Sequence, residues 1–399
     1  MNMDKRYSIG ILATHPIQYY IPWYRKLAGH PEINLKVFYC HRQSPQDQAR
    51  AGFDVAFDWD IPLLDGYAYQ FLVNKSRHPN VYTFFGCDTP EIMRIISHGS
   101  FDAFIVHGWN VLSFWQAMLA CFRMRTPVMV RGDSQLLTRR SLLKRVFKYL
   151  TYPWFVRKFA AYLVVGKRAE EYYLHYGADK KKMFNVCHCV DNDFFACARA
   201  ALESQRWELR RSWGIPEDSV VFLFAGKLIP KKRPDDFLKA LKIACNHSQG
   251  IFGLVVGDGP LRRDLEDFSG KVNLPVAFVG FLNQREITKA YTASDVLVLP
   301  SDARETWGLV VNEAFACRIP AIVSDAVGCA PDLILPGETG EVFHCGDVGR
   351  CAEIFKDFAI NSDYAKEMGS NAYKLIMDYS LTKATLGTLA AIQAVVKNG

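Results

Sequence analysis

The feature that most constrains this fold is the alternation of short apolar strands with helices, which occurs in two successive series. The predicted strands of the first series are residues 8–14, 35–40, 101–108, 127–133 and 161–166. The second series starts afresh, with predicted strands at 220–226, 251–259, 276–280, 295–301 and 320–325. Strands that alternate with helices favour parallel sheets covered by helices. The sequence therefore predicts an α/β protein with two Rossmann-like domains.

The chain length supports this division, because 399 residues exceed what one ordinary core organises. The weakly patterned, charge-rich stretch around 190–215 marks the connection. We expect an N-terminal domain over 1–195, a second domain over 196–380, and a C-terminal helix over 381–399 that could pack back on the first domain.

Composition excludes several classes of protein. Half of the residues are apolar and 13% are aromatic, which excludes a disordered chain. No apolar run reaches the roughly 18–20 residues that a membrane span needs, and the N-terminus lacks the features of a signal peptide. Eleven scattered cysteines, an odd number, indicate reduced thiols in a cytoplasm and not a disulfide framework.

Residues 295–320 read as a binding site for a nucleotide diphosphate sugar. An apolar strand over 295–299 runs into a polar loop, and a helix opens near Gly308. A helix N-terminus at the carboxyl end of a parallel strand is where phosphates bind in open α/β sheets. Two carboxylates, Glu305 and Glu313, bracket this site and would be aimed at sugar and ribose hydroxyls. The alternative is that Glu305 only caps the helix and Glu313 is solvated.

Other strand ends of the second series carry further candidates. Gly226 would let a ligand approach the backbone, and Lys227 and Lys232 would then neutralise a leaving diphosphate. The alternative for the lysines is a solvated basic loop. The turn at Gly257 follows a buried strand, and Phe281 could lie against a flat base or belong to the core.

These elements follow one another in an order that resembles the donor domain of the retaining GT-B glycosyltransferases of family 4 (glycosyl transferases group 1). The resemblance covers about 220–340 and rests on FAGKLIPKKRP, VGDGP, VGF, PSDARETWGLVVNEA with its Glu-x7-Glu spacing, and SDAVGCAPDLI followed by GETG. It implies a GT-B fold of two Rossmann-like domains that face one another across a cleft, with the acceptor bound mainly by the first.

The resemblance also implies roles for individual residues. Lys227 and Lys232 would hold the diphosphate, with Gly226 and Gly257 beside them. Glu305 would contact sugar hydroxyls, and Glu313 the ribose. The remaining donor-binding positions would be Phe281 near the base and the amides of Gly308, Leu309 and Val310 at the phosphate.

The chain departs from the family pattern at several positions. Arg318 stands where the family usually has glycine, and Trp307 where it has phenylalanine; we expect packing adjustments there. The first half lacks the family's glycine-rich loop and its usual histidine. His15 and Asp133 are the candidates to take over acceptor-side catalysis, and His107 is a third; each could instead be a hydrogen-bonded loop residue.

Two short motifs resemble metal sites but are predicted not to be. Asp58 and Asp60 form an Asp-x-Asp pair far from any diphosphate element, and the segment 187–189 (Cys-His-Cys) has no second ligand cluster at suitable spacing. We therefore expect no metal and no cofactor besides the nucleotide sugar.

Positive charge gathers in the first half of the chain. Residues 1–200 carry 26 Lys/Arg against 16 Asp/Glu, and the segment 135–169 has nine basic residues and no acidic one. The basic, aromatic-rich stretch 139–158 is either a solvated helix face or a helix that lies on an anionic membrane. Nucleic-acid binding is disfavoured because no recognised motif accompanies the charge.

Together these features predict a metal-independent, retaining hexosyltransferase. It would move a sugar from a UDP- or GDP-sugar to a saccharide or lipid-linked acceptor in bacterial surface polysaccharide synthesis. It would be cytoplasmic, with peripheral binding at the inner membrane face as an option. The alternatives are a sugar-nucleotide epimerase on the same fold and a catalytically silent scaffold subunit. A dehydrogenase is disfavoured, since no G-x-G-x-x-G follows the first strand.

Overall fold

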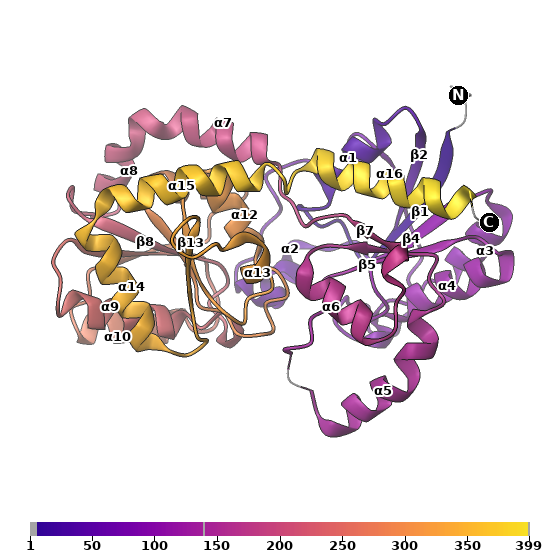
Figure 1. The fold of residues 1–399 in the computed structure, drawn as a ribbon, viewed down its shortest axis with the longest axis horizontal. Coiled ribbons are helices and arrows are strands. Elements are labelled where there is room, and N and C mark those ends of the chain that lie inside the picture. Colours follow the sequence, from indigo (N-terminus) through magenta and orange to yellow (C-terminus); the bar gives the residue numbers. More distant parts are fainter. Residues whose placement is uncertain (1–5, 139, 398–399) are drawn as a thin grey trace. The chain divides into compact units, whose positions relative to one another are not determined.

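The computed structural model describes residues 6–138 and 140–397. The chain forms two compact units, each built around a parallel sheet with flanking helices (Figure 1). The first unit contains residues 1–43, 62–188 and 381–399, and the second contains 44–61 and 189–380. The predicted α/β class with two Rossmann-like domains is confirmed.

The sheet of the first unit has seven strands in the order β3-β2-β1-β4-β5-β6-β7. Their bounds are β1 Tyr7–Ala13, β2 Ile33–Tyr39, β3 Ala68–Phe71, β4 Ala103–Val106, β5 Val128–Gly132, β6 Ala161–Val164 and β7 Met183–Asn185. Central β1 pairs in parallel with both β2 and β4, so Ile9 lies opposite Leu35 on one side and Ala103 on the other. The strand order reverses direction at β1, which is the position where open α/β sheets bind ligands.

Six α-helices of the described residues belong to the first unit. Their bounds are α1 Ile21–Ala28, α3 Glu91–His98, α4 Leu112–Met124, α5 Leu142–Val156, α6 Lys167–His175 and α16 Leu381–Lys397. Phe104 of β4 packs in one cluster with Phe114 and Met118 of α4. The C-terminal helix α16 packs against α1, β6 and β7, so it belongs to the first unit although it follows the second in sequence.

The sheet of the second unit repeats the same order with six strands, β10-β9-β8-β11-β12-β13. Their bounds are β8 Val220–Ala225, β9 Ile251–Val256, β10 Val276–Gly280, β11 Val296–Leu299, β12 Ala321–Ser324 and β13 Gly340–Phe343. Strands β8, β9 and β11 are buried at every position, as expected for parallel strands covered on both faces.

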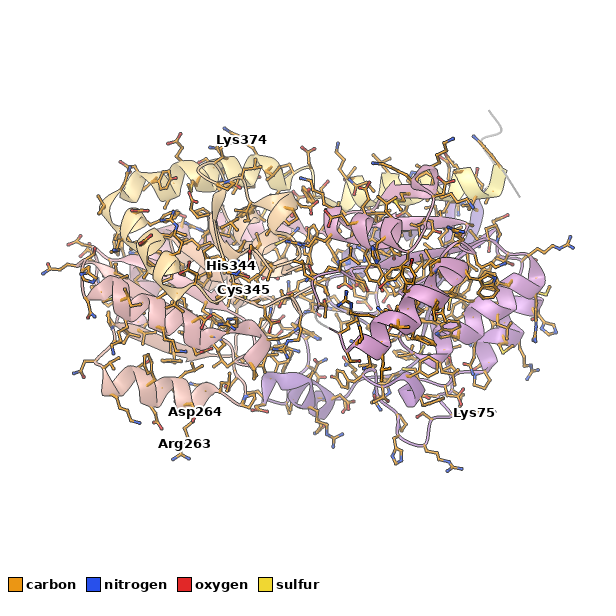
Figure 2. All side chains as sticks on the ribbon, turned by 60° about the horizontal axis from the view of Figure 1, so that its bottom comes forward. Lys75, Arg263, Asp264, His344, Cys345 and Lys374 are labelled. Carbon is orange, nitrogen blue, oxygen red and sulfur yellow. The ribbon has the colours of Figure 1, made fainter. Side chains whose placement is uncertain are left out.

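Ten helices of the described residues belong to the second unit. They are α2 Pro45–Gln48, α7 Asn192–Leu202, α8 Arg206–Ser212, α9 Pro234–Cys245, α10 Arg262–Lys271, α11 Ile287–Ala293, α12 Leu309–Ala316, α13 Ala330–Leu333, α14 Val348–Ile360 and α15 Ser362–Ile376. Phe222 of β8 stacks on Phe355 of α14 with ring centroids 4.2 Å apart, which fixes the helix on the sheet. The outer helix faces are polar, and Arg263 and Lys374 extend outward from α10 and α15 (Figure 2).

The segment 44–61 packs with the second unit, whereas the sequence placed it within an N-terminal domain over 1–195. It contains α2 and the following helical turn Ala49–Phe53. The sequence gives no sign of this excursion, because it depends on contacts with residues more than 170 positions away. No helix among the described residues is both long and apolar enough to cross a bilayer.

Candidate functional site

Two glycine loops interlock at the carboxyl edge of the second sheet. Gly226 follows β8 with φ +151°, and Gly257 follows β9 with φ +127°. A Cβ atom at Gly257 would lie 2.0 Å from the carbonyl oxygen of Gly226. The backbone N–H of Leu228 donates to the carbonyl of Asp258 at 2.9 Å. Only glycine allows this approach, so the loops hold the adjacent lysines at the strand ends.

A buried ion pair joins the loop after β8 to the loop after β11. Lys232 Nζ lies 2.6 Å from Glu305 Oε2, and both side chains are 12% exposed. Burial alone would raise the pKa of Glu305. The positive charges of Lys232, Lys231 and Lys227 lower it by more than burial raises it, so the pKa of Glu305 lies below its usual range. Glu305 is therefore an ionised carboxylate at neutral pH.

Lys227 is directed at the segment 44–61. Its Nζ donates to the carbonyl of Ala51 at 2.7 Å and lies 4.3 Å from the ring centroid of Phe53. Burial, with the positive charges of Lys231 and Lys232, lowers the pKa of Lys227 to about 8. Lys227 and Lys232 thus lie in one site, but they have different protein partners.

The start of α12 completes this edge of the sheet. Gly308 precedes the helix and has φ +103°. A Cβ atom added at this position would lie 2.7 Å from Leu299 Cδ2. Leu309 and Val310 are the first residues of the helix, where backbone N–H groups favour an anion. Gly308 occupies the N-cap position, and Glu305 in the preceding loop is paired with Lys232.

Glu313 lies inside the second unit and not on its surface. The residue is 3% exposed, and its Oε2 accepts a hydrogen bond from the Tyr291 hydroxyl of α11 at 2.6 Å. The alternative interpretation, in which the Glu313 side chain is solvated, is therefore wrong. Trp307 is also buried, with its indole N–H donating to Asn312 at 2.8 Å, and Arg318 stacks over Tyr373 at 4.1 Å.

The segment 44–61 covers Phe281 at the end of β10. The Phe281 ring centroid lies 4.1 Å from that of Phe57 and 5.3 Å from that of Phe53. The Asn283 side chain donates to the carbonyl of Asp58, and the Asp60 carboxylate accepts the backbone N–H of Arg285 at 3.0 Å. Asp58 and Asp60 thus lie on the segment that packs over the donor-side loops.

The acceptor-side candidates meet in a separate cavity of the first unit. His15 follows β1, His107 follows β4 and Asp133 follows β5, and these three strands are neighbours in the sheet. All three residues line one cavity of about 590 Å³, together with Tyr20 and Trp109. The structure therefore brings together residues that the sequence could only place at separate strand ends.

The buried charge of Arg131 affects the two histidines His107 and His188. Its guanidinium lies 5.0 Å from the ring centroids of both Tyr20 and Trp23, and the residue is 4% exposed. Burial, and then the Arg131 charge, hold the pKa values of His107 and His188 well below their usual range. Both imidazoles are therefore neutral at pH 7 and available as hydrogen-bonding groups.

The candidates differ in their partners within the cavity wall. His107 Nε2 and the Tyr24 hydroxyl lie 2.9 Å apart, whereas His15 Nδ1 lies 3.0 Å from the Thr14 hydroxyl. The Asp133 side chain is 45% exposed, with its Oδ2 3.9 Å from His188 Nε2. Asp133 therefore offers a partly exposed carboxylate to this cavity.

Helix α5 gives the basic stretch 139–158 an unusual surface; Arg139 lies outside the described residues. Five large apolar side chains on it are at least 62% exposed, namely Leu142, Leu143, Phe147, Leu150 and Trp154. In contrast, Lys148 on the same helix is 8% exposed and donates to the Tyr172 hydroxyl at 2.9 Å. The sequence did not single out Lys148, because charge patterning alone suggests that every lysine of a basic helix is solvated.

A family and several known proteins are similar to this chain. Residues 205–375 match the family model described as glycosyl transferases group 1. A D-inositol 3-phosphate glycosyltransferase of Streptomyces coelicolor is 28% identical over 251 residues, which cover 58% of this chain and 54% of that protein. Sulfoquinovosyl transferase SQD2 of Arabidopsis thaliana is 32% identical over 49% of this chain and 37% of its own length. The chain spans about half the length of the curated relatives it matches.

Solved structures share the fold over nearly the whole chain. A glycosyltransferase from Rickettsia africae aligns with a TM-score of 0.72 at 14% identity, covering 99% of this chain and 100% of that one. Anabaena HepE in complex with UDP and glucose aligns with a TM-score of 0.70 at 14% identity, covering 97% and 100%. WaaG, a glycosyltransferase involved in lipopolysaccharide biosynthesis, gives 0.65 at 16% identity, covering 96% and 98%.

Proposed function

Because this chain belongs to the glycosyl transferases group 1 family through residues 205–375, we propose that it is a retaining glycosyltransferase. It takes a hexose from a UDP- or GDP-sugar and transfers it to a saccharide or lipid-linked acceptor. The observation that carries this proposal is the buried Lys232–Glu305 ion pair at the carboxyl edge of the second sheet, beside the N-terminus of α12.

The charges of this edge suit a nucleoside diphosphate. Lys227, Lys231 and Lys232 supply three cations, of which Glu305 balances one. The N-terminus of α12 adds partial positive charge. Negative charge that develops on the departing diphosphate is stabilised by these groups in place, so the proposal assigns no role to a metal.

The carboxylates hold the sugar and the ribose in this proposal. Glu305 is ionised and fixed by Lys232, so it can accept hydrogen bonds from sugar hydroxyls. Glu313 Oε2 accepts a hydrogen bond from the Tyr291 hydroxyl, so Oε1 would accept the hydrogen bond from a ribose hydroxyl. The base would lie near Phe281, which requires Phe57 to move aside.

On the acceptor side, the cavity lined by His15, His107 and Asp133 would receive the attacking hydroxyl. Asp133 and His15 are the candidates to contact it. The exposed apolar and basic surface of α5 supports a protein that works in the cytoplasm at an anionic membrane face. We also propose a role in bacterial surface polysaccharide synthesis, and the structural neighbour WaaG, which is involved in lipopolysaccharide biosynthesis, is in keeping with it.

A panel of UDP- and GDP-sugars tests the proposal. Binding is measured by calorimetry, and products are analysed with and without saccharide acceptors, with the anomeric configuration read by NMR. We expect one nucleotide sugar to bind and its sugar to be transferred with retention. A changed sugar nucleotide formed without acceptor would identify an epimerase instead. No binding of any member would support a scaffold subunit.

A further inference from the structure

Lys148 is a buried cation that no catalytic role described above uses. Its ammonium lies 4.8 to 5.8 Å from the ring centroids of Tyr152, Tyr172 and Tyr176, besides donating to the Tyr172 hydroxyl. Arg140 is close enough to lower the pKa of Lys148, after the larger effect of burial. Among residues 6–138 and 140–397, neither cation forms an ion pair, and the carboxylate that shares the cavity with them, Asp133, lies 3.9 Å from His188 Nε2.

Two cations that form no ion pair with a carboxylate favour the binding of an anion. A lysine ammonium that is removed from water normally has a carboxylate partner, since burial of an unpaired charge is costly. The three tyrosine rings supply part of the compensation through their negative faces. They leave the net positive charge of the pair unbalanced, and a phosphate that accepts from both cations and from Tyr172 would balance it.

The position of this pair between two cavities indicates the shape of the ligand. Lys148, Arg140 and Tyr172 line both the cavity of about 590 Å³ at the ends of β1, β4 and β5 and a second cavity of about 850 Å³. The second cavity lies against α5 and α6. Its apolar lining residues are Leu136, Leu137, Leu142, Val146 and Leu150.

A ligand that fills both cavities must therefore be polar at one end, anionic in the middle and apolar at the other end. We propose that Lys148 and Arg140 bind the phosphate or diphosphate of a lipid-linked acceptor. Its head group occupies the cavity with His15, His107 and Asp133, and its apolar chain lies along α5 in the second cavity. This inference rests on the proposed glycosyltransferase function and narrows the acceptor to a phosphate-bearing lipid.

Direct binding tests the inference without turnover. Farnesyl diphosphate is titrated into the full chain by calorimetry, beside farnesol and inorganic pyrophosphate, which carry only the chain or only the anion. We expect farnesyl diphosphate to bind at least about tenfold more tightly than either part. Equal affinity for farnesol, or no binding of farnesyl diphosphate, would overturn the proposal.

Variants locate the anion. We expect Lys148→Met and the exposed Arg140→Gln each to weaken farnesyl diphosphate binding about tenfold or more. Lys144→Met is the matched control, because Lys144 is exposed on the same helix and lines neither cavity. An equal loss in the control would show general attraction to a basic surface, and the specific site would then be wrong.

Nucleotide binding separates this inference from the proposed function. UDP affinity, which depends on the second unit, should be unchanged in Lys148→Met, and it also reports that the variant is folded. Retained UDP binding with no effect of Lys148→Met on farnesyl diphosphate would overturn the lipid-phosphate site alone. Absence of UDP binding in the unaltered protein would instead remove the proposed function.

Discussion

Lys232 and Glu305 are mutually dependent, because each compensates the buried charge of the other. Removal of one partner from a buried pair costs about 3–5 kcal/mol, since the remaining charge is uncompensated. The 12% exposure of both side chains places this pair near that regime. Stability and ligand binding should therefore respond differently to single and double substitutions at these two positions.

We predict that Lys232→Met lowers the free energy of unfolding by about 2–4 kcal/mol and abolishes most UDP-sugar binding and transfer. Adding Glu305→Gln should restore most of the stability, because no buried carboxylate remains, without restoring binding. Urea denaturation and calorimetry on the three proteins measure both quantities. Wild-type UDP-sugar binding in the double variant would contradict the role of Lys232 in the donor site.

Lys227 predicts a pH dependence of nucleotide binding. Its pKa of about 8 lies below the ordinary lysine value, so the cation is present below that pH and is lost as pH rises through it. UDP affinity, measured by calorimetry from about pH 7 to about pH 9.5, should therefore decline above about pH 8. Lys227→Met should bind more weakly at pH 7 and lack this decline. The same decline in the variant would assign the titration to another group.

At the scale of elements, the segment 44–61 is the main surprise. This segment contacts two side chains that we expect the donor to contact. The carbonyl of Ala51 accepts a hydrogen bond from Lys227, and the ring of Phe57 packs on Phe281. The C-terminal part of the segment is held by Asn283 and by the backbone N–H of Arg285. A nucleotide that contacts Lys227 and Phe281 must first displace these contacts.

We therefore expect Phe57→Ala to raise UDP affinity several-fold, because less packing must be given up when nucleotide binds. Hydrogen exchange at 44–61 should also become faster on addition of UDP to the unaltered protein. Trp59→Ala is a useful comparison, since the Trp59 ring packs edge-on against Phe57 and Phe53 in the same segment. Weaker UDP binding by Phe57→Ala would show that the segment forms part of the site instead of covering it.

Individual elements show what the sequence could predict. The strand ends at Gly226 and Gly257 were located correctly, because each glycine follows a continuous apolar strand, and the helix start near Gly308 was located correctly as well. The burial of Lys148 could not be predicted, because it depends in part on Tyr172 and Tyr176 of α6 and its C-cap. The placement of 44–61 was equally hidden, since aromatic residues in a loop do not specify which unit they contact.

At the scale of the whole molecule, repetition made the architecture predictable. When the strands of each sheet are numbered from its first strand, both sheets have the order 3-2-1-4-5-6, and the first sheet adds a seventh strand at its edge. Two series of alternating strands and helices imply such sheets. The acceptor-side candidates of the first unit were harder to choose from the sequence, because the family's motifs are absent there. The structure brings His15, His107 and Asp133 together, because they follow the neighbouring strands β1, β4 and β5.

The surface of α5 predicts how the whole protein behaves at a membrane. Leu143, Phe147 and Trp154 are 62–83% exposed, and Lys144 and Arg145 lie beside them in the sequence. Each basic residue near an anionic surface contributes on the order of 1 kcal/mol, and the apolar side chains add burial in the interface. We expect reversible co-sedimentation with anionic vesicles at low salt and release at high salt.

Charge reversal of Arg140, Lys144 and Arg145 together should prevent this sedimentation, and Leu143→Asp should weaken it at every salt concentration. Leu386→Asp is the matched control, because Leu386 is 53% exposed on α16 of the same unit and has no basic cluster beside it. The control should sediment as the unaltered protein does. If the unaltered protein stays in the supernatant at low salt, α5 is not a membrane-binding helix, and its apolar face must then be explained by the acceptor chain alone.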